Sequence, residues 1–329
     1  MNKLLRLGPV LFASIAVMIS CSKEVSVSAD SIEKRILDAH IKVVYNNSIQ
    51  PTSSGLYIIN ETVGTGAPVQ KTCGVFVRYS TLDLRHNYLS TSYDTVAKRV
   101  GGFTDSTYYG PQLFEMGNYT MIRGLEEALI KLREGSKVRL IIPSWLSDYD
   151  YQGSSRLYGS TMIYDIEVLK VIDSVAQFEI DTLEAFSAKH YGGVDSLSKG
   201  FYFKSLSAGI GDTLKVGDNI SYWYVGKLLD GFVFDTNIED TARKYHIYNP
   251  GRSGGYIALE QTLQDPVNSD GTVIKGMAKI FLNMKHGGKA VSFFSSDWGY
   301  GSTQMAFGIY QPLFFYVEVV TDNKDDTDN

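Results

Sequence analysis

The sequence is poor in cysteine: its 329 residues contain two, Cys21 and Cys73. Two cysteines exclude a disulfide framework and a Cys-based metal site, and the five histidines are scattered without metal-ligand spacing. Excess positive charge is also lacking, because 31 Lys and Arg stand against 36 Asp and Glu. A net charge of −5 makes nucleic acid an unexpected partner. No phosphate-binding G-x-x-x-x-G-K-[ST] loop occurs, so no nucleotide site is indicated. With no metal-ligand spacing either, no cofactor is expected.

The sequence has no run of about 20 apolar residues, the length that a membrane-spanning helix needs. Its mostly apolar stretch 7–19 is shorter and follows two basic residues, which predicts a signal peptide over 1–20. The residues before Cys21 resemble the bacterial lipobox, in which the cysteine is lipidated and becomes the mature N-terminus: Met18-Ile19-Ser20. An ordinary signal peptide that happens to contain a cysteine is the alternative. The lipobox predicts a protein of the cell envelope, anchored by its N-terminal lipid in the periplasm, at the outer membrane or on the surface.

Both ends of the mature chain differ from its body. Residues 21–48 are expected to form a tether followed by an N-terminal helix, because apolar residues recur at helical spacing over 31–45. For this helix, packing on the folded body is favoured over binding to a membrane or a partner. The last nine residues, 321–329, carry four Asp and no apolar side chain, which predicts a frayed acidic tail.

The body of the chain is an internal repeat. Four segments recur in the same order at offsets between 145 and 152 residues. They begin at Gly55 and Gly200, at Val77 and Tyr222, at Ile122 and Ile274, and at Tyr164 and Phe315. The chain therefore contains two copies of one domain of about 120 residues, here called the first copy and the second copy.

Each copy contains one short amphipathic helix among predicted strands. The apolar residues lie at i, i+3, i+4 and i+7: Leu125, Ala128, Leu129 and Leu132, then Met277, Ile280, Phe281 and Met284. Gly135 is expected to end the first helix, and Gly287 the second. A sheet packed on a single helix defines an α+β fold. A further helix over 175–191 is expected to connect the two copies.

Three segments of each copy resemble the FKBP family of peptidyl-prolyl cis-trans isomerases. In the first copy they are Met121-Ile122-Arg123-Gly124-Leu125, the run 135–144 and Tyr164-Asp165-Ile166-Glu167-Val168. In the second copy they are Phe232-Val233-Phe234-Asp235-Thr236, Val273-Ile274-Lys275-Gly276-Met277 and Trp298-Gly299-Tyr300-Gly301. The resemblance covers roughly 55–172 and 200–320.

The resemblance implies an α+β fold of two FKBP-like domains, each a bent antiparallel sheet wrapped on one short helix. The first domain is expected over 49–173, and a connector helix with the second domain over 174–320. An apolar pocket between helix and sheet would receive a proline ring. The implied activity is peptidyl-prolyl cis-trans isomerisation that helps exported proteins to fold, with prolyl-containing polypeptides as partners.

The family's pocket positions fall on specific residues of the second copy. The implied catalytic residues are Tyr224, Phe234, Asp235, Ile274 and Tyr300, and the implied substrate-binding residues are Val273, Met277 and Phe315. Met277 stands where the family usually has tryptophan. The backbone N–H of Ile274 would fix the residue after proline, and Tyr300 and Asp235 would orient the substrate.

The first copy keeps less of the pattern. It matches at Tyr79, Met121, Ile122, Leu125 and Tyr164. Leu89 and Ser90 stand in place of the Phe-Asp pair, and the Tyr that precedes Gly in the family is replaced around Asp148-Tyr149. Activity is therefore expected mainly in the second copy.

Alternatives to an isomerase site remain open. The aromatic residues can be core alone, or the pockets can bind peptides or partner proteins without catalysis. Asp235 can serve only to cap a turn, and the long segment 237–272 can shape a substrate groove or cover it. The G-x-S-x-G run 251–255 lacks the flanking elements of a hydrolase and is interpreted as a flexible loop.

Overall fold

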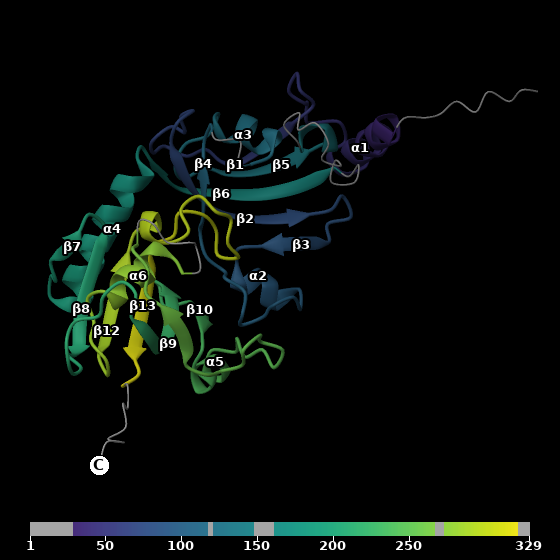
Figure 1. Cartoon of the computed structure of the whole chain (residues 1–329). Coiled ribbons are helices and arrows are strands. Elements are labelled where there is room, and N and C mark those ends of the chain that lie inside the picture. The colour runs from purple at the N-terminus through teal and green to yellow at the C-terminus, as the bar shows by residue number, and fades with distance from the viewer. Residues whose placement is uncertain (1–28, 118–120, 148–160, 267–272, 322–329) are drawn as a thin grey trace, which may run out of the picture.

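The computed structural model describes residues 29–117, 121–147, 161–266 and 273–321. The predicted signal peptide, Cys21, the tether up to residue 28 and the tail from residue 322 lie outside the described residues. In Figure 1 the first copy lies above the second copy, and the long helix α4 (Val175–Tyr191) runs beside the second copy. No described helix has the length and apolar character needed to cross a bilayer.

The first copy is an antiparallel sheet whose strands do not follow chain order. The order is β1 (Tyr57–Thr62), β5 (Lys137–Ile142), β6 (Met162–Ile172), β2 (Gly74–Leu82) and β3 (Tyr88–Thr91), with β4 (Gln112–Glu115) also paired to β2. The short helix α3 (Arg123–Leu129) packs on one face of this sheet, and Leu125, Ala128 and Leu129 enter its core. A second short helix, α2 (Asp94–Arg99), follows β3.

The second copy repeats this topology strand for strand. The order is β8 (Phe201–Ser207), β12 (Lys289–Phe294), β13 (Leu313–Val319), β9 (Asn219–Leu228) and β10 (Val233–Thr236), with β11 (Leu259–Thr262) paired to β9. Strand β7 (Ser196–Ser198) adds to β8, and α5 (Glu239–Lys244) and α6 (Lys275–Phe281) correspond to α2 and α3. The shared order confirms the predicted repeat and the α+β class.

Each copy also carries a long helix on the other face of its sheet. Leu37 and Ile41 of α1 (Ala29–Tyr45) pack on Tyr57 and Ile141 of the first sheet. Leu183 of α4 packs in the same way on the outer face of the second sheet, against residues that include Tyr202, Phe293 and Phe314. The helix expected as a connector is therefore also part of the packing of the second copy.

A buried glutamate fixes each long helix to its sheet. Glu33 of α1 accepts hydrogen bonds from the backbone N–H of Ser144 at 2.8 Å and from the Thr161 hydroxyl at 2.7 Å. Glu179 of α4 accepts from the N–H of Ser296 at 3.0 Å and from its hydroxyl at 2.9 Å. The two serines begin equivalent 3₁₀ turns, Ser144–Leu146 and Ser296–Trp298, so the helices belong to the repeated unit.

The short helices end earlier than their apolar spacing predicts. Helix α3 ends at Leu129, and Leu132 reaches the core from the turn that follows. Gly135 has φ +87°, but it lies in the turn before β5 and does not cap the helix. The expectation of a helix up to Leu132 was wrong, because a buried apolar residue satisfies the same spacing from a turn as from a helix.

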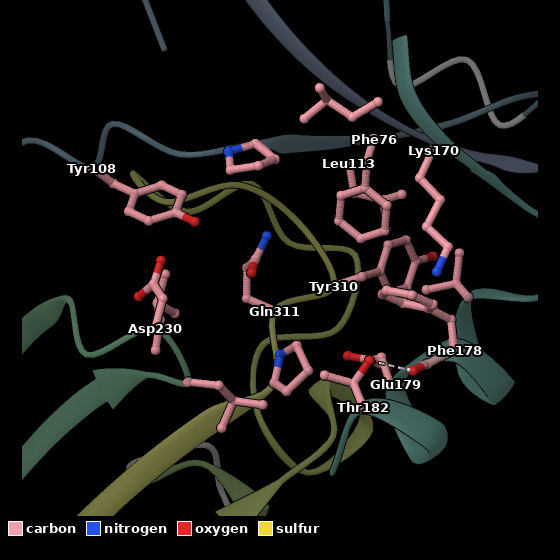
Figure 2. Close-up of a pocket in the computed structure, with 16 residues that line it drawn as sticks. Phe76, Tyr108, Leu113, Lys170, Phe178, Glu179, Thr182, Asp230, Tyr310 and Gln311 are labelled. Atoms are coloured by element: carbon pink, nitrogen blue, oxygen red, sulfur yellow. Dashed lines mark hydrogen bonds between the residues drawn. The ribbon is translucent and has the colours of Figure 1, made fainter. Parts of the chain in front are cut away.

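The two copies touch through side chains on both sides of a cleft (Figure 2). The ring of Tyr108 in the first copy lies 5.2 Å from that of Phe232 in the second. The Tyr310 hydroxyl donates to the Glu115 carboxylate at 2.8 Å. Between these contacts is a largely apolar cleft of about 330 Å³.

Candidate functional site

An aromatic pocket forms in the second copy because its strands alternate. Residues 220, 222, 224, 226 and 228 of β9 all point toward α6, as do 313, 315, 317 and 319 of β13. Tyr224 and Phe315 therefore meet in one layer, with ring centroids 6.3 Å apart. Phe234 of β10 meets the Phe315 ring edge to face, at 5.8 Å and 82°.

A β-bulge lets two consecutive residues face this pocket. Adjacent strand residues normally point to opposite faces of a sheet. The pairing of β10 with β9 shifts between Val233 and Asp235, which leaves Phe234 as the extra residue. As a result Phe234 packs on the pocket aromatics while Asp235 reaches the hydroxyl of Tyr224.

A glycine makes room for the two rings. Gly226 pairs across the sheet with Phe315. A Cβ atom at this position would lie 2.8 Å from the Phe234 ring, closer than Cβ atoms come to such neighbours, and 3.0 Å from the Phe315 ring, which is also a tight contact. The absence of a side chain at Gly226 therefore allows the edge-to-face pair to form.

Asp235 is the centre of a polar network at the edge of the pocket. It accepts a short hydrogen bond from the Tyr224 hydroxyl and pairs with Arg252 at 2.7 Å. Arg252 also donates to the Tyr224 hydroxyl at 3.2 Å. Burial, followed by the nearby Asp235 carboxylate, raises the pKa of Tyr224 above its usual range. Tyr224 therefore stays a neutral donor, and the partners of Asp235 show that it does more than cap a turn.

The backbone between β10 and α5 is fixed from within. Buried Asn237 accepts from the Tyr224 N–H at 2.8 Å and donates to the carbonyls of Tyr222 and Ile257, each at 2.9 Å. The Thr236 hydroxyl donates to the Tyr224 carbonyl at 2.6 Å. These bonds hold the residues that follow Asp235 against β9, so the position of the carboxylate is well defined.

The opposite wall comes from the start of α6 and from the loop after β12. Val273 and Ile274 pack against the pocket core, and Met277 is buried in it. Ile274 has extended backbone (φ −65°, ψ 149°), and its N–H donates to no acceptor among the described residues. Tyr300 lies 6.5 Å from the Phe234 ring, and burial, with a smaller effect of Asp235, raises the pKa of its hydroxyl. Tyr300 is therefore a neutral donor at physiological pH.

The structure brings all eight residues implied for the second copy to one site, packed in or against a single core cluster or bonded to it. Two neighbours were missed from the sequence. Phe307 lies 4.9 Å from the Phe234 ring. Arg252 was assigned to a flexible loop. The only feature of the sequence that pointed to it was Asp235, a carboxylate that needs a charged partner.

The first copy has the same backbone but not the same side chains. The Ser92 hydroxyl accepts from the Tyr79 N–H at 2.8 Å, as Asn237 does from Tyr224, which fixes the correspondence of the two copies. Leu89 then takes the place of Phe234, again at a bulge, but 56% of its surface is exposed. Ser90 takes the place of Asp235 and is exposed.

The first copy also lacks the glycine that makes room for the two rings in the second copy. Thr81 takes the place of Gly226, and it is buried directly across from Tyr164. Tyr79, Ile122 and Leu125 still gather on one core cluster, together with Met121. The replacement around Asp148-Tyr149 lies outside the described residues. Where it is described, the first copy therefore has a core of the same plan without the polar network.

No group of three or more His, Cys, Asp or Glu side chains within the described ranges has the arrangement of a metal site. Cys73 is buried just before β2, and burial raises the pKa of its thiol. The candidate site is therefore the aromatic pocket, whose polar groups are two tyrosine hydroxyls and the ion pair of Asp235 with Arg252.

Comparison with known families identifies the family of each copy. The sequence matches the family described as FKBP-type peptidyl-prolyl cis-trans isomerase over residues 87–169 and 211–320, one match in each copy. Together the matches cover more than half of the chain. The chain therefore belongs to the FKBP-type peptidyl-prolyl cis-trans isomerase family.

The curated relatives are distant. The peptidyl-prolyl cis-trans isomerase FKBP9 of Bos taurus is 26% identical over 185 residues, 55% of this chain and 26% of that protein. A probable FKBP-type isomerase of Haemophilus influenzae is 28% identical over 155 residues, 46% of this chain and 55% of that protein. The chain thus spans between a quarter and about half of the length of these relatives.

Two solved structures show some similarity to this chain. The three FKBP domains of wheat FKBP73 match with 18% identity and a TM-score of 0.29, over 83% of this chain and 98% of that one. FkpA from Escherichia coli matches with 22% identity and a TM-score of 0.33, over 44% of this chain and 61% of that one.

Proposed function

We propose that the chain is a peptidyl-prolyl cis-trans isomerase whose activity resides mainly in the second copy. The observation that carries the proposal is the pocket in which Phe234 and Phe315 meet edge to face beside the bonded set of Tyr224, Asp235 and Arg252. The first copy has Leu89 and Ser90 at the corresponding positions, so it has neither feature.

The reaction requires no nucleophile. Rotation about an X–Pro bond has a barrier of about 18–20 kcal/mol, which comes from amide resonance. A site that binds the twisted amide better than either planar form lowers that barrier. An acceleration of about 10⁴ to 10⁵ requires roughly 5–7 kcal/mol. Apolar walls and two or three well-placed hydrogen bonds supply energies of this order.

Each pocket group has a role in this scheme. The rings of Phe234 and Phe315, with Met277, hold the proline ring in an apolar setting. The Ile274 N–H fixes the residue after proline, and the Tyr300 hydroxyl donates to the substrate backbone. Asp235, compensated by its partners, holds Tyr224 in place and takes no proton from the substrate.

A protease-free isomerisation assay on the full chain tests the proposal, with several residues before proline. Combining Asp235→Ala with Tyr300→Phe should lower kcat/KM ten- to a hundredfold, about 1.4–2.7 kcal/mol, without unfolding. Ser90→Ala is the matched control, because Ser90 occupies the position of Asp235 in the first copy. If Ser90→Ala removes the activity instead, the assignment to the second copy is wrong.

Met277, which stands where the family usually has tryptophan, favours a second candidate function. The pocket would then bind prolyl peptides or partner proteins without catalysis. Tyr300-dependent peptide binding by a wild-type chain that shows no isomerisation would establish this function in place of the first.

The chain is further proposed to be an exported lipoprotein of the cell envelope that helps exported proteins to fold. The apolar stretch 7–19 and the lipobox-like residues before Cys21 support this. Cys21→Ala should abolish fatty-acid labelling and the salt-resistant part of membrane-fraction association, whereas Cys73→Ala, the matched control, should leave both unchanged. Unaltered labelling of the Cys21→Ala protein would contradict the proposal.

A further inference from the structure

The outward face of α1 carries apolar side chains that nothing in the described structure covers. Ile32, Ile36 and Val43 are 43%, 54% and 82% exposed, and Ala39 between them is exposed as well. Their spacing of i, i+4, i+7 and i+11 places them in one stripe along the helix. This stripe is separate from Leu37 and Ile41, which pack on the sheet.

Two basic residues border the stripe. At 100° per residue, Arg35 and Lys42 lie side by side next to Ala39 on the solvent face, and both are exposed. Neither pairs with an acidic group among the described residues. Glu33 is buried under the helix, and Asp38 bonds Lys34 at 3.4 Å. The outward face therefore combines apolar and unpaired basic side chains, although the chain as a whole is acidic.

The equivalent helix of the second copy provides an internal comparison. The shared glutamates Glu33 and Glu179 show that Phe178 of α4 corresponds to Ile32. Phe178 is covered by the first copy, where its ring lies 5.1 Å from that of Phe76 (Figure 2). The residues that correspond to Ile36 and Val43 are Thr182 and Lys189. In α4 this face is thus partly covered at Phe178 and polar at Thr182 and Lys189, which leaves Ala185 as its exposed apolar residue, whereas all four positions of the stripe in α1 are apolar and exposed.

We propose that the outward face of α1 lies on an anionic membrane surface. A helix with an apolar stripe bordered by basic residues is the kind that lies in the plane of a bilayer interface, where cations meet anionic headgroups. Helix α1 is at the end of the first copy away from the second copy, so the face is accessible (Figure 1). This surface goes beyond the isomerase pocket and does not depend on it.

The position of the helix in the chain fits this partner. Only seven residues separate Cys21 from Ala29 at the start of α1, and the eight residue-to-residue steps between them span at most about 29 Å when extended. A lipid on Cys21 would therefore keep α1 near the bilayer. This step alone rests on the proposed lipid anchor; the apolar and basic face stands without it.

Vesicle flotation of the unlipidated chain 22–329, which contains every described residue, tests the surface directly. The chain should bind vesicles rich in phosphatidylglycerol, bind phosphatidylcholine vesicles weakly, and lose binding as salt is raised. Ile36→Ser with Val43→Ser should weaken binding at least tenfold. Ile210→Ser with Val216→Ser, at positions of the second copy that are 61% and 58% exposed, should have no effect.

A fluorescent reporter then locates the contact. An environment-sensitive dye on Val43→Cys should shift to the blue with anionic vesicles, and the same dye on Lys189→Cys, the equivalent position of α4, should not. Cys73 is buried and should not take the label.

Three results would overturn the proposal. The wild-type chain could fail to bind anionic vesicles, or the control substitutions Ile210→Ser and Val216→Ser could weaken vesicle binding as much as the α1 substitutions do. The third is a dimer in sedimentation that the α1 substitutions abolish. The last would assign the face to a second copy of the chain. Because no lipid is attached, failure of lipidation at Cys21 would not affect any of these outcomes.

Discussion

Replacing Glu179 with glutamine should remove a pH dependence from the stability of the second copy. Glu179 is 3% exposed, and burial raises its pKa to about 7 from an ordinary value of 4.5. The bonds from Ser296 oppose this shift but do not cancel it. The buried carboxyl group therefore favours its protonated form between about pH 4.5 and 7, where an exposed glutamate is ionised.

The sign and size of the effect follow from proton linkage. Between pH 4.5 and 7 the folded state binds more protons than the unfolded state, so the free energy of unfolding falls as the pH rises. The contribution of Glu179 is fully present below pH 4.5 and is lost as the pH passes 7. A pKa difference of about 2.5 corresponds to roughly 3 kcal/mol.

Glutamine imitates the protonated side chain, because its oxygen can accept from the Ser296 N–H and its amide can donate to the Ser296 hydroxyl. Glu179→Gln should thus stabilise the second copy by up to about 3 kcal/mol at pH 8, and by less than about 1 kcal/mol at pH 5. The free energy of unfolding of the second copy can be measured at each pH by hydrogen exchange of the β12 and 3₁₀-turn amides as a function of urea concentration. Glu33→Gln, the matched change in α1, should leave the pH dependence of the second copy intact. An equal effect of Glu179→Gln at both pH values would refute the reasoning.

Two further predictions concern packing. Gly226→Ala places a Cβ atom 2.8 Å from the Phe234 ring, so the second copy should lose about 1–3 kcal/mol in urea unfolding and part of its activity; Gly251→Ala, whose Cβ atom would meet only the Asn249 side-chain oxygen at 3.4 Å, should change neither. Tyr108→Ala removes the aromatic contact with Phe232 and should increase the radius of gyration measured by small-angle X-ray scattering; an unchanged radius would mean that the remaining contacts hold the copies together.

The aromatic site itself was largely predictable, because each of its parts is encoded locally. Tyr224, Phe234 and Phe315 lie on strands with alternating apolar residues, and the order of the segments repeats once along the chain. The same local order identified the family. Even the replacement of the Phe-Asp pair by Leu89 and Ser90 was visible, since the offset between the copies stays at 145 residues through that region.

Several features depended on contacts between distant residues. Arg252 lies 17 positions from Asp235 in a loop of no recognisable pattern, and only folding brings the two charges together. The importance of Gly226 follows from its cross-strand partner, Phe315, which is far away in sequence. The helical spacing of the apolar residues also could not predict that Leu132 enters the core from a turn.

The long helices α1 and α4 separate what the sequence predicts from what the tertiary structure decides. Apolar spacing predicted helices over 31–45 and 175–191, because a helix brings every third or fourth residue to one face. It could not predict which apolar residues would be covered. Leu37 and Ile41 of α1 pack on the sheet while Ile36 and Val43 stay exposed. The sequence by itself determined the periodic elements and their repetition, and the tertiary structure decided what each face meets, because burial depends on neighbours that only the folded chain supplies.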